Sequence, residues 1–543
     1  MSEASAEVLK AHDKLRERRR REEPVWRDLA RMLRPDDQDF SSAERVDGRS
    51  AKRDLSDAEL FDSTPLYALD DFAKGLFKQA SNPANRWFEI TIANPDLAKY
   101  RPVKDWCHTV TNIIYASLGP SVSRYYTQVM PWFGNLGAFG FGVLYSQEDI
   151  GRQRIIDRSL PIGQMYLDVD AEGEYNTAHR EFKLRGNQIK SKFGDRVRRL
   201  TLDDDKSYSL VHSVRPNLDY RPGMIGPRGM SYLSSYVSPD LKEMRLDDGY
   251  YEFPFFIPVW NERDGSPYPT GPGHMVRADA AMLQEQERSH IVAAQFAAEP
   301  PILLDENSML TAADIVPNAA LHGGMSEQGK RLVEVLERKQ QPVLSLQLSE
   351  QRRNAIRNAF LFSVLQLLNR PQMTATEFNG FSQQQLEQAA PNLVNIQTGG
   401  LTPFIQRRYQ ILSRAGQLPP APPELNGQRI DIDYVSPLAK AQKIGSARSA
   451  LSFAQSVIGL SEAFPEARDN VDIDEVVRLM HDGMTDNPAL IRDPRAVAQA
   501  REARGQQQRA MMQMQLAEQA GGVMADVAHA RQAATLADGR GGK

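Results

Sequence analysis

The chain has 543 residues, which is more than one compact core usually holds, and this length predicts roughly three or four folding units. Lys and Arg total 66 against 70 Asp and Glu, so the formal net charge is −4. The absence of a chain-wide basic excess argues against a protein that coats nucleic acid by neutralising its phosphates. Cys107 is the single cysteine, which excludes an intramolecular disulfide and a zinc site built from cysteines.

The sequence predicts neither a secretory signal nor a membrane span. Residues 1–14 are polar and lack the apolar run of a signal sequence. The longest nearly apolar run, 359–368, is about half of the roughly 20 residues that cross a bilayer. We therefore expect a protein without direct membrane insertion, and the single cysteine fits a reducing compartment.

Two helices are predicted near the N-terminus. The first covers 7–33 and carries a sparse apolar stripe. Its four arginines at 18–21 are followed at once by two glutamates, and we interpret this run as a solvated helix face, with contact to DNA or lipid as the alternative. The second helix covers 54–80, and extended structure follows at 87–92.

The stretch 133–260 has a mixed pattern that is rich in strand signals. Residues 139–145 are predicted to form a strand. Turns are predicted at 170–174 and 247–249, where acidic residues and glycine separate β-branched or aromatic stretches. Residues 253–260 carry two prolines, which predicts an edge strand or an extended segment.

The pattern changes to mainly helical at residue 276. The stretch 302–341 is rich in loop signals, and 343–348 alternates like a strand. Ser349 has the chemistry of a helix cap. Helices are predicted over 276–299, 350–368, 374–390, 401–415 and 437–504, with a further partly helical stretch at 506–520.

The search for catalytic motifs finds no intact one. Residues 324–330 have the glycine and lysine spacing of a phosphate-binding loop, but Arg331 stands where Ser or Thr would hold magnesium, so we interpret them as a loop. The acidic run 203–205 is typical of a turn cap rather than a two-metal site. The glycines of 137–142 lack dinucleotide-binding spacing and favour tight sheet packing. We predict no catalytic residue, no cofactor and no metal site.

Several short blocks, in this order, resemble one known family. They include Pro161-Ile162-Gly163-Gln164-Met165-Tyr166 and Met373-Thr374-Ala375-Thr376-Glu377, and the full set lies at 161–194, 253–260, 265–273, 373–377 and 435–439. Together they resemble the podovirus-type phage portal family, also called head-to-tail connectors. Pro269 stands where the family pattern has glycine, and Arg185 stands where it has threonine. These departures bear on which subgroup of the family the chain resembles, more than on its function.

The resemblance implies an α+β, mainly helical fold with wing, stem, clip and crown regions, assembled as a dodecameric ring around a channel. It implies a structural protein and not an enzyme. The regions it predicts are 1–50, an N-terminal helical arm; 51–275, a mixed α/β wing; 276–299, the first stem helix; 300–345, the clip; 346–369, the second stem helix; 370–436, a channel loop and wing return helices; 437–504, a helical crown; and 505–543, a tail that is partly helical or disordered.

The same resemblance implies the partners. Double-stranded DNA passes through the channel without sequence specificity, and the terminase binds before the tail adaptor does. Capsid and scaffolding proteins are the other partners. The expected location is the portal vertex of the virion, after assembly in the host cytoplasm.

Sliding DNA requires a channel lining of mixed charge, because each neutralised phosphate adds affinity. We therefore expect only a few basic positions to face the DNA or the clip partners. For Arg352, Arg353 and Arg357, salt bridges between subunits are the alternative role. The candidates are Arg352, Arg353, Arg357 and Arg370 for the channel, and Lys330, Arg331, Arg338 and Lys339 for the clip.

Two other classes of protein compete with this interpretation. Another structural virion protein, such as a tail adaptor or an internal ejection protein, is the first. A packaging ATPase or nuclease is the second, and it requires the intact phosphate loop and acidic metal cluster that the sequence lacks.

Overall fold

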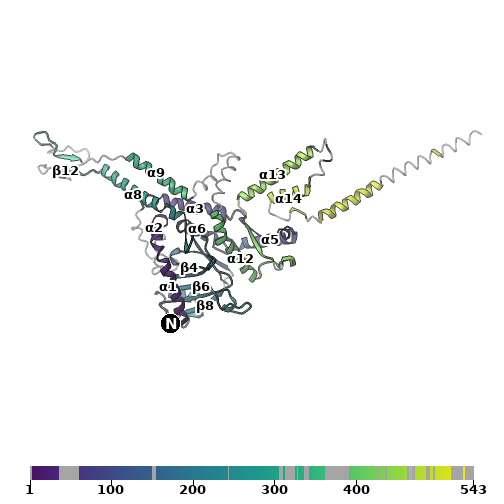
Figure 1. Cartoon of the computed structure of the whole chain (residues 1–543), viewed down its shortest axis with the longest axis horizontal. Helices are drawn as coiled ribbons and strands as arrows, with labels where there is room; N and C mark the ends of the chain where they lie inside the picture. The colour runs from purple at the N-terminus through teal and green to yellow at the C-terminus, as the bar shows by residue number, and fades with distance from the viewer. Residues whose placement is uncertain are drawn as a thin grey trace, which may run out of the picture. The chain divides into compact units, whose positions relative to one another are not determined.

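The structure, a computed structural model, divides into two compact units (Figure 1). The first contains residues 1–88 and 110–419, and the second contains 89–109 and 420–543. Residues 361–390 lie outside the described residues, and with them the end of the helix predicted over 350–368 and the whole of the helix predicted over 374–390. The structure describes residues 3–35, 60–149, 154–241, 244–304, 310–311, 325–326, 328–335, 342–360, 391–425, 428–434, 437–460, 464, 466, 471–484, 490–492, 496–514 and 530–531.

A five-stranded antiparallel sheet lies in the first unit. The turn predicted at 170–174 joins its first two strands and is confirmed, since Asp170 accepts hydrogen bonds from the backbone N–H of Glu172 and Glu174. The turn predicted at 247–249 is wrong, because these residues pair with the neighbouring strand inside the sheet. In spatial order the strands are β4 (Met165–Val169), β5 (Tyr175–Arg185), β6 (Ser207–Pro216), β7 (Tyr232–Val237) and β8 (Arg245–Tyr250).

A smaller sheet has the order β3 (Arg154–Leu160), β2 (Val143–Asp149) and β9 (Phe255–Phe256). β9 lies at its edge, as the prolines around it predicted. The strand predicted over 139–145 is wrong in its first half. Phe139 instead ends the helix α6 (Tyr125–Phe139), and Gly140 caps this helix with φ 84°, in the left-handed region that favours glycine.

Two helices of the first unit pack closely on each other. α3 (Thr64–Ala80) packs on α6, so the helix predicted over 54–80 is confirmed from Thr64 onward, while the described residues 60–63 before it are not helical. A Cβ atom on Gly137 would lie 2.7 Å from side-chain atoms of Leu69 and Phe72. The glycine at this position therefore permits close packing of two helices, and the predicted sheet packing is wrong here.

The N-terminal arm consists of two helices, so the single helix predicted over 7–33 is wrong. α1 spans Glu3–Arg19 and α2 spans Glu23–Leu33. Pro24 lies in the first turn of α2, where a residue without a backbone N–H is favoured, and a new helix begins there. α1 contacts β4, β6 and β7, and α2 contacts α3 and α6.

Arg19 is buried, contrary to our interpretation of 18–21 as a solvated face. Its side chain is 1% exposed. Its guanidinium donates to the carbonyl oxygens of Gly163 (2.8 Å) and Met165 (3.0 Å) and to Glu23 (2.9 Å). Only the other three arginines of the run are exposed. Arg19 thus fastens α1 to the start of β4.

Shorter elements complete the first unit. Residues 203–205 form the predicted turn cap, since Asp203 accepts a hydrogen bond from the backbone N–H of Asp205 (3.1 Å). The helix predicted over 401–415 is confirmed as α12. The elements are α7 (Gly186–Phe193), β10 (Asn261–Arg263), β11 (Ser266–Thr270), β12 (Ile302–Leu304), β13 (Val333–Val335) and α12 (Thr402–Arg414), besides two helices described with the site below.

The second unit is mainly helical in its described part. β1 (Phe88–Ile92), which confirms the extended structure predicted at 87–92, pairs with β14 (Ile430–Tyr434). Helical residues continue at 496–514. The helices are α4 (Pro95–Lys99), α5 (Arg101–Leu118, which begins here and ends in the first unit), α13 (Pro437–Leu460) and α14 (Ile473–Met484).

A buried ion pair ties α12 to β3. Arg408 and Asp157 are both 0% exposed, and Asp157 also accepts a hydrogen bond from Ser123. A buried charge without its partner costs far more than a surface charge does. The pair therefore makes the attachment of α12 specific.

We expect Asp157→Ala to lower the free energy of unfolding by about 3–5 kcal/mol, because Arg408 would stay buried without a counter-charge. Asp149→Ala is the matched control on the same hairpin, since its partner Arg154 is exposed and the loss should stay under about 1 kcal/mol. Urea denaturation of both variants measures the difference. Equal losses would contradict this account of the buried pair.

A buried histidine makes stability depend on pH. Burial, followed by the nearby His12 and Arg215, lowers the pKa of His179 from 6.5 to about 3. The unfolded chain therefore binds a proton below pH 6.5 that the folded chain excludes, and the free energy of unfolding should fall between about pH 6.5 and 3. Denaturation across this range should show a shallower decline in His179→Gln, and an unchanged slope would contradict the assignment.

Candidate functional site

Two long helices of the first unit form the candidate site. α8 spans Pro272–Ala298, 27 residues, or about 40 Å. It confirms the helix predicted over 276–299, and it starts earlier because Pro272 occupies its first turn. α9 spans Pro342–Ala359 and packs along α8 (Figure 1). β12 follows α8 directly and pairs with β13 in an antiparallel ribbon.

The start of α9 differs from the prediction. The strand predicted over 343–348 is wrong, because these residues are helical from Pro342 onward. Ser349, predicted as the cap, lies inside the helix and is buried. An alternating stretch this short also fits a helix, and packing against α8 decides between the two.

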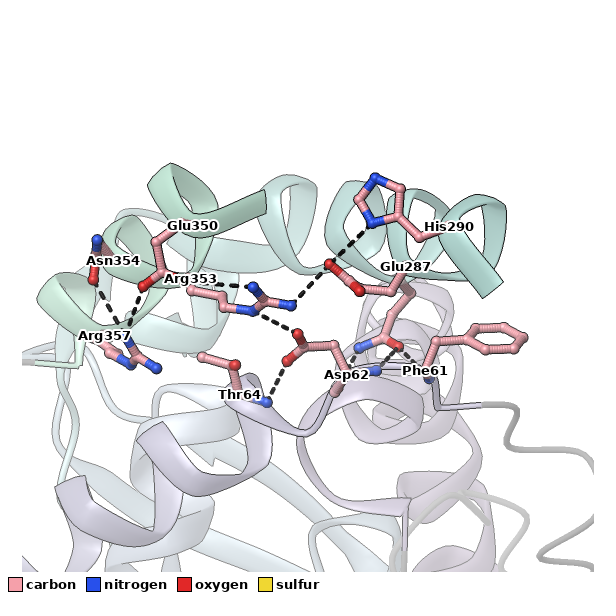
Figure 2. Close-up of polar contacts among 10 residues, drawn as sticks. Phe61, Asp62, Thr64, Glu287, His290, Glu350, Arg353, Asn354 and Arg357 are labelled. Carbon is pink, nitrogen blue, oxygen red and sulfur yellow. Dashed lines mark hydrogen bonds and ion pairs between the residues drawn. The ribbon is translucent and has the colours of Figure 1, made fainter. Parts of the chain in front are cut away.

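The body end of α8 is held by apolar packing, and this packing stops one turn before a cluster of charges. Val276, Ala280 and Leu283 are buried. The next turns of α8 carry Gln284, which bonds the residues just before α3, and Glu287, which faces Arg353 of α9 (Figure 2). The junction between the helical pair and the body is therefore polar.

Arg353 of α9 is the centre of this junction (Figure 2). Its Nε donates to Asp62 Oδ2 at 2.8 Å, and its Nη2 donates to Glu287 Oε1 at 2.8 Å. Its Nη1 lies 3.3 Å from Glu350. One planar guanidinium thus joins three segments of the chain: the residues before α3, α8 and α9.

Gln284 of α8 adds hydrogen bonds from an uncharged side chain to the junction around Arg353. Its Oε1 accepts from the backbone N–H of Phe61 (2.7 Å) and Asp62 (3.0 Å), and its Nε2 donates to the carbonyl oxygen of Asp62 (2.7 Å). Asp62 in turn accepts from the backbone N–H of Thr64 at 2.7 Å, in the first turn of α3. The start of α3 is therefore fixed to α8 through backbone as well as side-chain contacts.

Opposing effects act on the pKa of Asp62. Burial raises it, but the hydrogen bonds from Thr64 and the hydrogen bond and charge of Arg353 outweigh burial and bring the pKa below its ordinary value. Burial lowers the pKa of Arg353, and its hydrogen bond to Asp62 reverses this and raises it above the ordinary value. Both groups are charged at neutral pH, so the junction is an ion-pair network.

The two other predicted arginines of α9 also have partners in this chain. Arg352 donates to Asp279 of α8 at 2.6 Å. Arg357 is more exposed and lies 3.4 Å from Glu350 and 3.2 Å from Asn354. The structure brings all three arginines to one helix, and each has a carboxylate within ion-pair distance. Whether they contact DNA stays a prediction.

The predicted clip residues lie apart from this junction. Lys330 and Arg331 are exposed beside β13. Ser326 and Lys330 close a tight turn, in which the N–H of Ser326 donates to the Lys330 carbonyl oxygen at 2.8 Å. This geometry agrees with a loop rather than a phosphate site. The candidates Arg338, Lys339 and Arg370 lie outside the described residues.

Sequence reasoning missed the carboxylates and the amide of the junction: Asp62, Asp279, Gln284 and Glu287. One signal was present for Asp62, because Asp-Ser-Thr-Pro is a typical helix start. No local pattern linked Asp62 to Arg353, which is 291 positions away.

Within the described residues, no group of three or more His, Cys, Asp or Glu side chains is arranged to hold a metal ion. Over the same part of the chain, no helix has the length and apolar character needed to cross a membrane.

Comparisons with known proteins show the family of this chain. The family model described as bacteriophage head to tail connecting protein matches residues 5–488, so the chain belongs to that family. It is 26% identical over 510 residues to a probable portal protein of Bordetella phage BPP-1, covering 91% of this chain and 90% of that protein. It is 26% identical over 538 residues to the portal protein of Salmonella phage epsilon15, covering 96% and 95%.

Among solved structures, a chain from the neck of an empty GTA particle, computed with C6 symmetry, has a TM-score of 0.36 and 10% sequence identity. The match covers 80% of this chain and 95% of that one.

We expect Arg353→Ala to lower the free energy of unfolding by about 1–3 kcal/mol, because Asp62 would keep its burial and lose its charged donor. Arg353→Lys should recover only part of this, since an ammonium cannot span both carboxylates in one plane. Arg357→Ala is the control, with a loss under about 1 kcal/mol. Hydrogen exchange should show faster exchange in α9 of Arg353→Ala, and unchanged exchange would contradict the role of the junction.

Proposed function

We propose that this chain is the portal subunit of a short-tailed phage. Copies of it form a dodecameric ring at one capsid vertex, through which double-stranded DNA is packaged and ejected. The observation that carries the proposal is the head-to-tail connecting family match over 5–488 in a chain that spans 90% or more of two portal relatives. The role is structural, and the reaction that drives packaging belongs to the terminase.

The paired helices are the proposed stem of the ring. Beyond Leu283, α8 keeps large apolar side chains partly exposed, namely Ile291, Val292 and Phe296. Apolar surface on a long projecting helix indicates a partner protein. In the proposed ring these side chains pack against the neighbouring stem.

The other regions follow the predicted boundaries. The segment 300–345 is the proposed clip, which binds the terminase and later the tail adaptor through residues such as Lys330 and Arg331. The segment 437–504 is the proposed crown, and 51–275 is the proposed wing, which meets capsid and scaffolding proteins. Assembly takes place in the host cytoplasm before the ring enters the virion.

The arginines of α9 have two roles in this proposal. Arg353 holds the stem to the body through Asp62, and Arg352 joins the two stem helices to each other through Asp279. Arg357 is the better candidate on α9 for the channel surface, since its carboxylate partner, Glu350, lies on the same helix, and Arg370 stays a candidate on the sequence alone. Weak, dispersed basic groups allow DNA to slide because few phosphates are neutralised at any moment.

The alternative structural roles have less support. A tail adaptor or an internal ejection protein would not be expected to align along 95% of a portal protein. A packaging ATPase or nuclease needs a phosphate loop that the sequence lacks.

The first test is electron microscopy of the purified full-length protein, viewed along the particle axis. We expect rings with an open central hole and a dodecameric subunit count. Sedimentation velocity at several salt concentrations gives the mass independently. A monodisperse monomer or dimer under all of these conditions would overturn the proposal.

A further inference from the structure

The face of α1 that packs on the five-stranded sheet is largely polar. α1 contacts β4, β6 and β7 of this sheet (Figure 1). Its buried side chains recur at intervals of three and four residues, which is the spacing of one helix face, and only two of them are aliphatic. They are Ser5, Val8, His12, Leu15 and Arg19. Apolar burial, which stabilises most helix contacts, therefore contributes little to this one.

The rest of the attachment consists of ion pairs and hydrogen bonds. Glu7 lies 3.3 Å from Arg215 of β6, and its side chain is 65% exposed. Arg18 pairs with Asp168 of β4, and both side chains are partly exposed. Solvent-exposed ion pairs stabilise only weakly. The strongest anchor is the buried guanidinium of Arg19, which lies at the C-terminal end of α1.

Two histidines meet beneath α1. His12 of α1 and His179 of β5 stack with their ring centroids 5.7 Å apart, and both are buried. His179 Nε2 lies 2.8 Å from the Ser213 hydroxyl, and His12 Nε2 lies 3.2 Å from Glu181. The Nδ1 atom of each ring is buried without a hydrogen-bond partner in the described chain. Such atoms cost free energy, and water would satisfy both if α1 moved away.

The presence of α1 keeps His179 uncharged. Burial, followed by the charges of His12 and Arg215, lowers the pKa of His179 from 6.5 to about 3. α1 covers the His179 ring and also carries His12, so its departure would remove the two largest causes of the shift. The pKa of His179 would then return toward 6.5.

The other charged and titratable groups around the two rings act in both directions. Glu181 favours a proton on His12, although it also accepts a hydrogen bond from the Tyr166 hydroxyl at 2.9 Å. Arg215 disfavours a proton on His179. By element, the groups are Glu7, His12, Arg18 and Arg19 on α1; Tyr166 and Asp168 on β4; His179 and Glu181 on β5; and Arg215 on β6, with His212 of β6 on the opposite face of the sheet.

We propose that residues 3–16 of α1 form a strap over the sheet that opens when His179 takes up a proton, while Arg19 stays fixed as the anchor of the strap. Opening exposes the polar face of the sheet and leaves the sheet itself and α2 folded. This inference does not depend on ring formation.

Proton linkage gives the size of the effect. His179 binds its proton between about pH 6.5 and 3 only when the strap is open, so acid favours the open state. From pH 7.5 to pH 5.5, the equilibrium constant for opening should therefore rise about tenfold.

The test is hydrogen exchange of the full-length protein at these two pH values, with each rate divided by the intrinsic rate at the same pH. The backbone amides of 8–16 should exchange faster than those of β5 and β6, and their opening constant should rise about tenfold at pH 5.5. The amides of α2 are the internal reference and should show no such rise. His179→Gln can keep a hydrogen bond to Ser213 but cannot take up the proton, so its rise should stay under about twofold.

His212→Gln is the matched control. His212 is also buried, and its Nε2 lies 2.9 Å from the Ser234 hydroxyl. It pairs with Arg180, the residue next to His179, and so lies on the face of the sheet away from α1. This variant should keep the tenfold rise. Thermal unfolding of each variant shows whether it folds, and His179→Asn replaces His179→Gln if the latter does not.

Three results would overturn the strap. The first is an opening constant of the wild type that is the same at both pH values. The second is equal exchange in α1 and in the sheet, because α1 would then leave only when the whole unit unfolds. The third is a tenfold rise that persists without His179, which would assign the proton to another group.

Discussion

The attachment of the α8–α9 pair to the body combines apolar packing with one central guanidinium, that of Arg353. Apolar packing secures α8 only as far as Leu283, and the next contacts along the helix are the polar ones around Arg353. Arg353 satisfies Asp62 and Glu287 together, which a lysine could not do in one plane. The direction in which both helices leave the body is therefore set by the hydrogen-bond geometry at Arg353 together with the apolar packing of Leu283 and Ile356, and the hydrogen bonds are the more directional of the two.

The sequence predicted the elements that carry local signals. α8 and α12 begin with proline in the first turn and were found within a few residues of their observed starts. Prediction from the sequence failed where contacts with a distant segment decide the secondary structure. Residues 343–348 alternate like a strand yet form a helix against α8, and 247–249 have turn chemistry yet pair with β7. Such short patterns fit two structures, and only the neighbouring element selects one.

The candidate site was half predictable for the same reason. A cluster such as Arg352, Arg353 and Arg357 is visible in the sequence because its members are adjacent. The carboxylate partners of these arginines are not visible in the sequence, because Asp279 lies 73 positions from Arg352 and Asp62 lies 291 positions from Arg353. Arg19 shows the same limit, because a run of four arginines gives no sign that one of them is buried.

These ion pairs also bear on how a protein can surround DNA without trapping it. α8 and α9 together carry five arginines and four Asp or Glu residues, so the pair of helices is close to neutral. Each phosphate neutralised adds affinity and salt dependence, and a strongly basic lining would hold DNA in place. Where arginines are already paired within the chain, contact with a phosphate must compete with a carboxylate a few ångströms away. In the proposed ring, the charges that fix the two helices to each other and to the body would also keep the channel only weakly attractive to DNA.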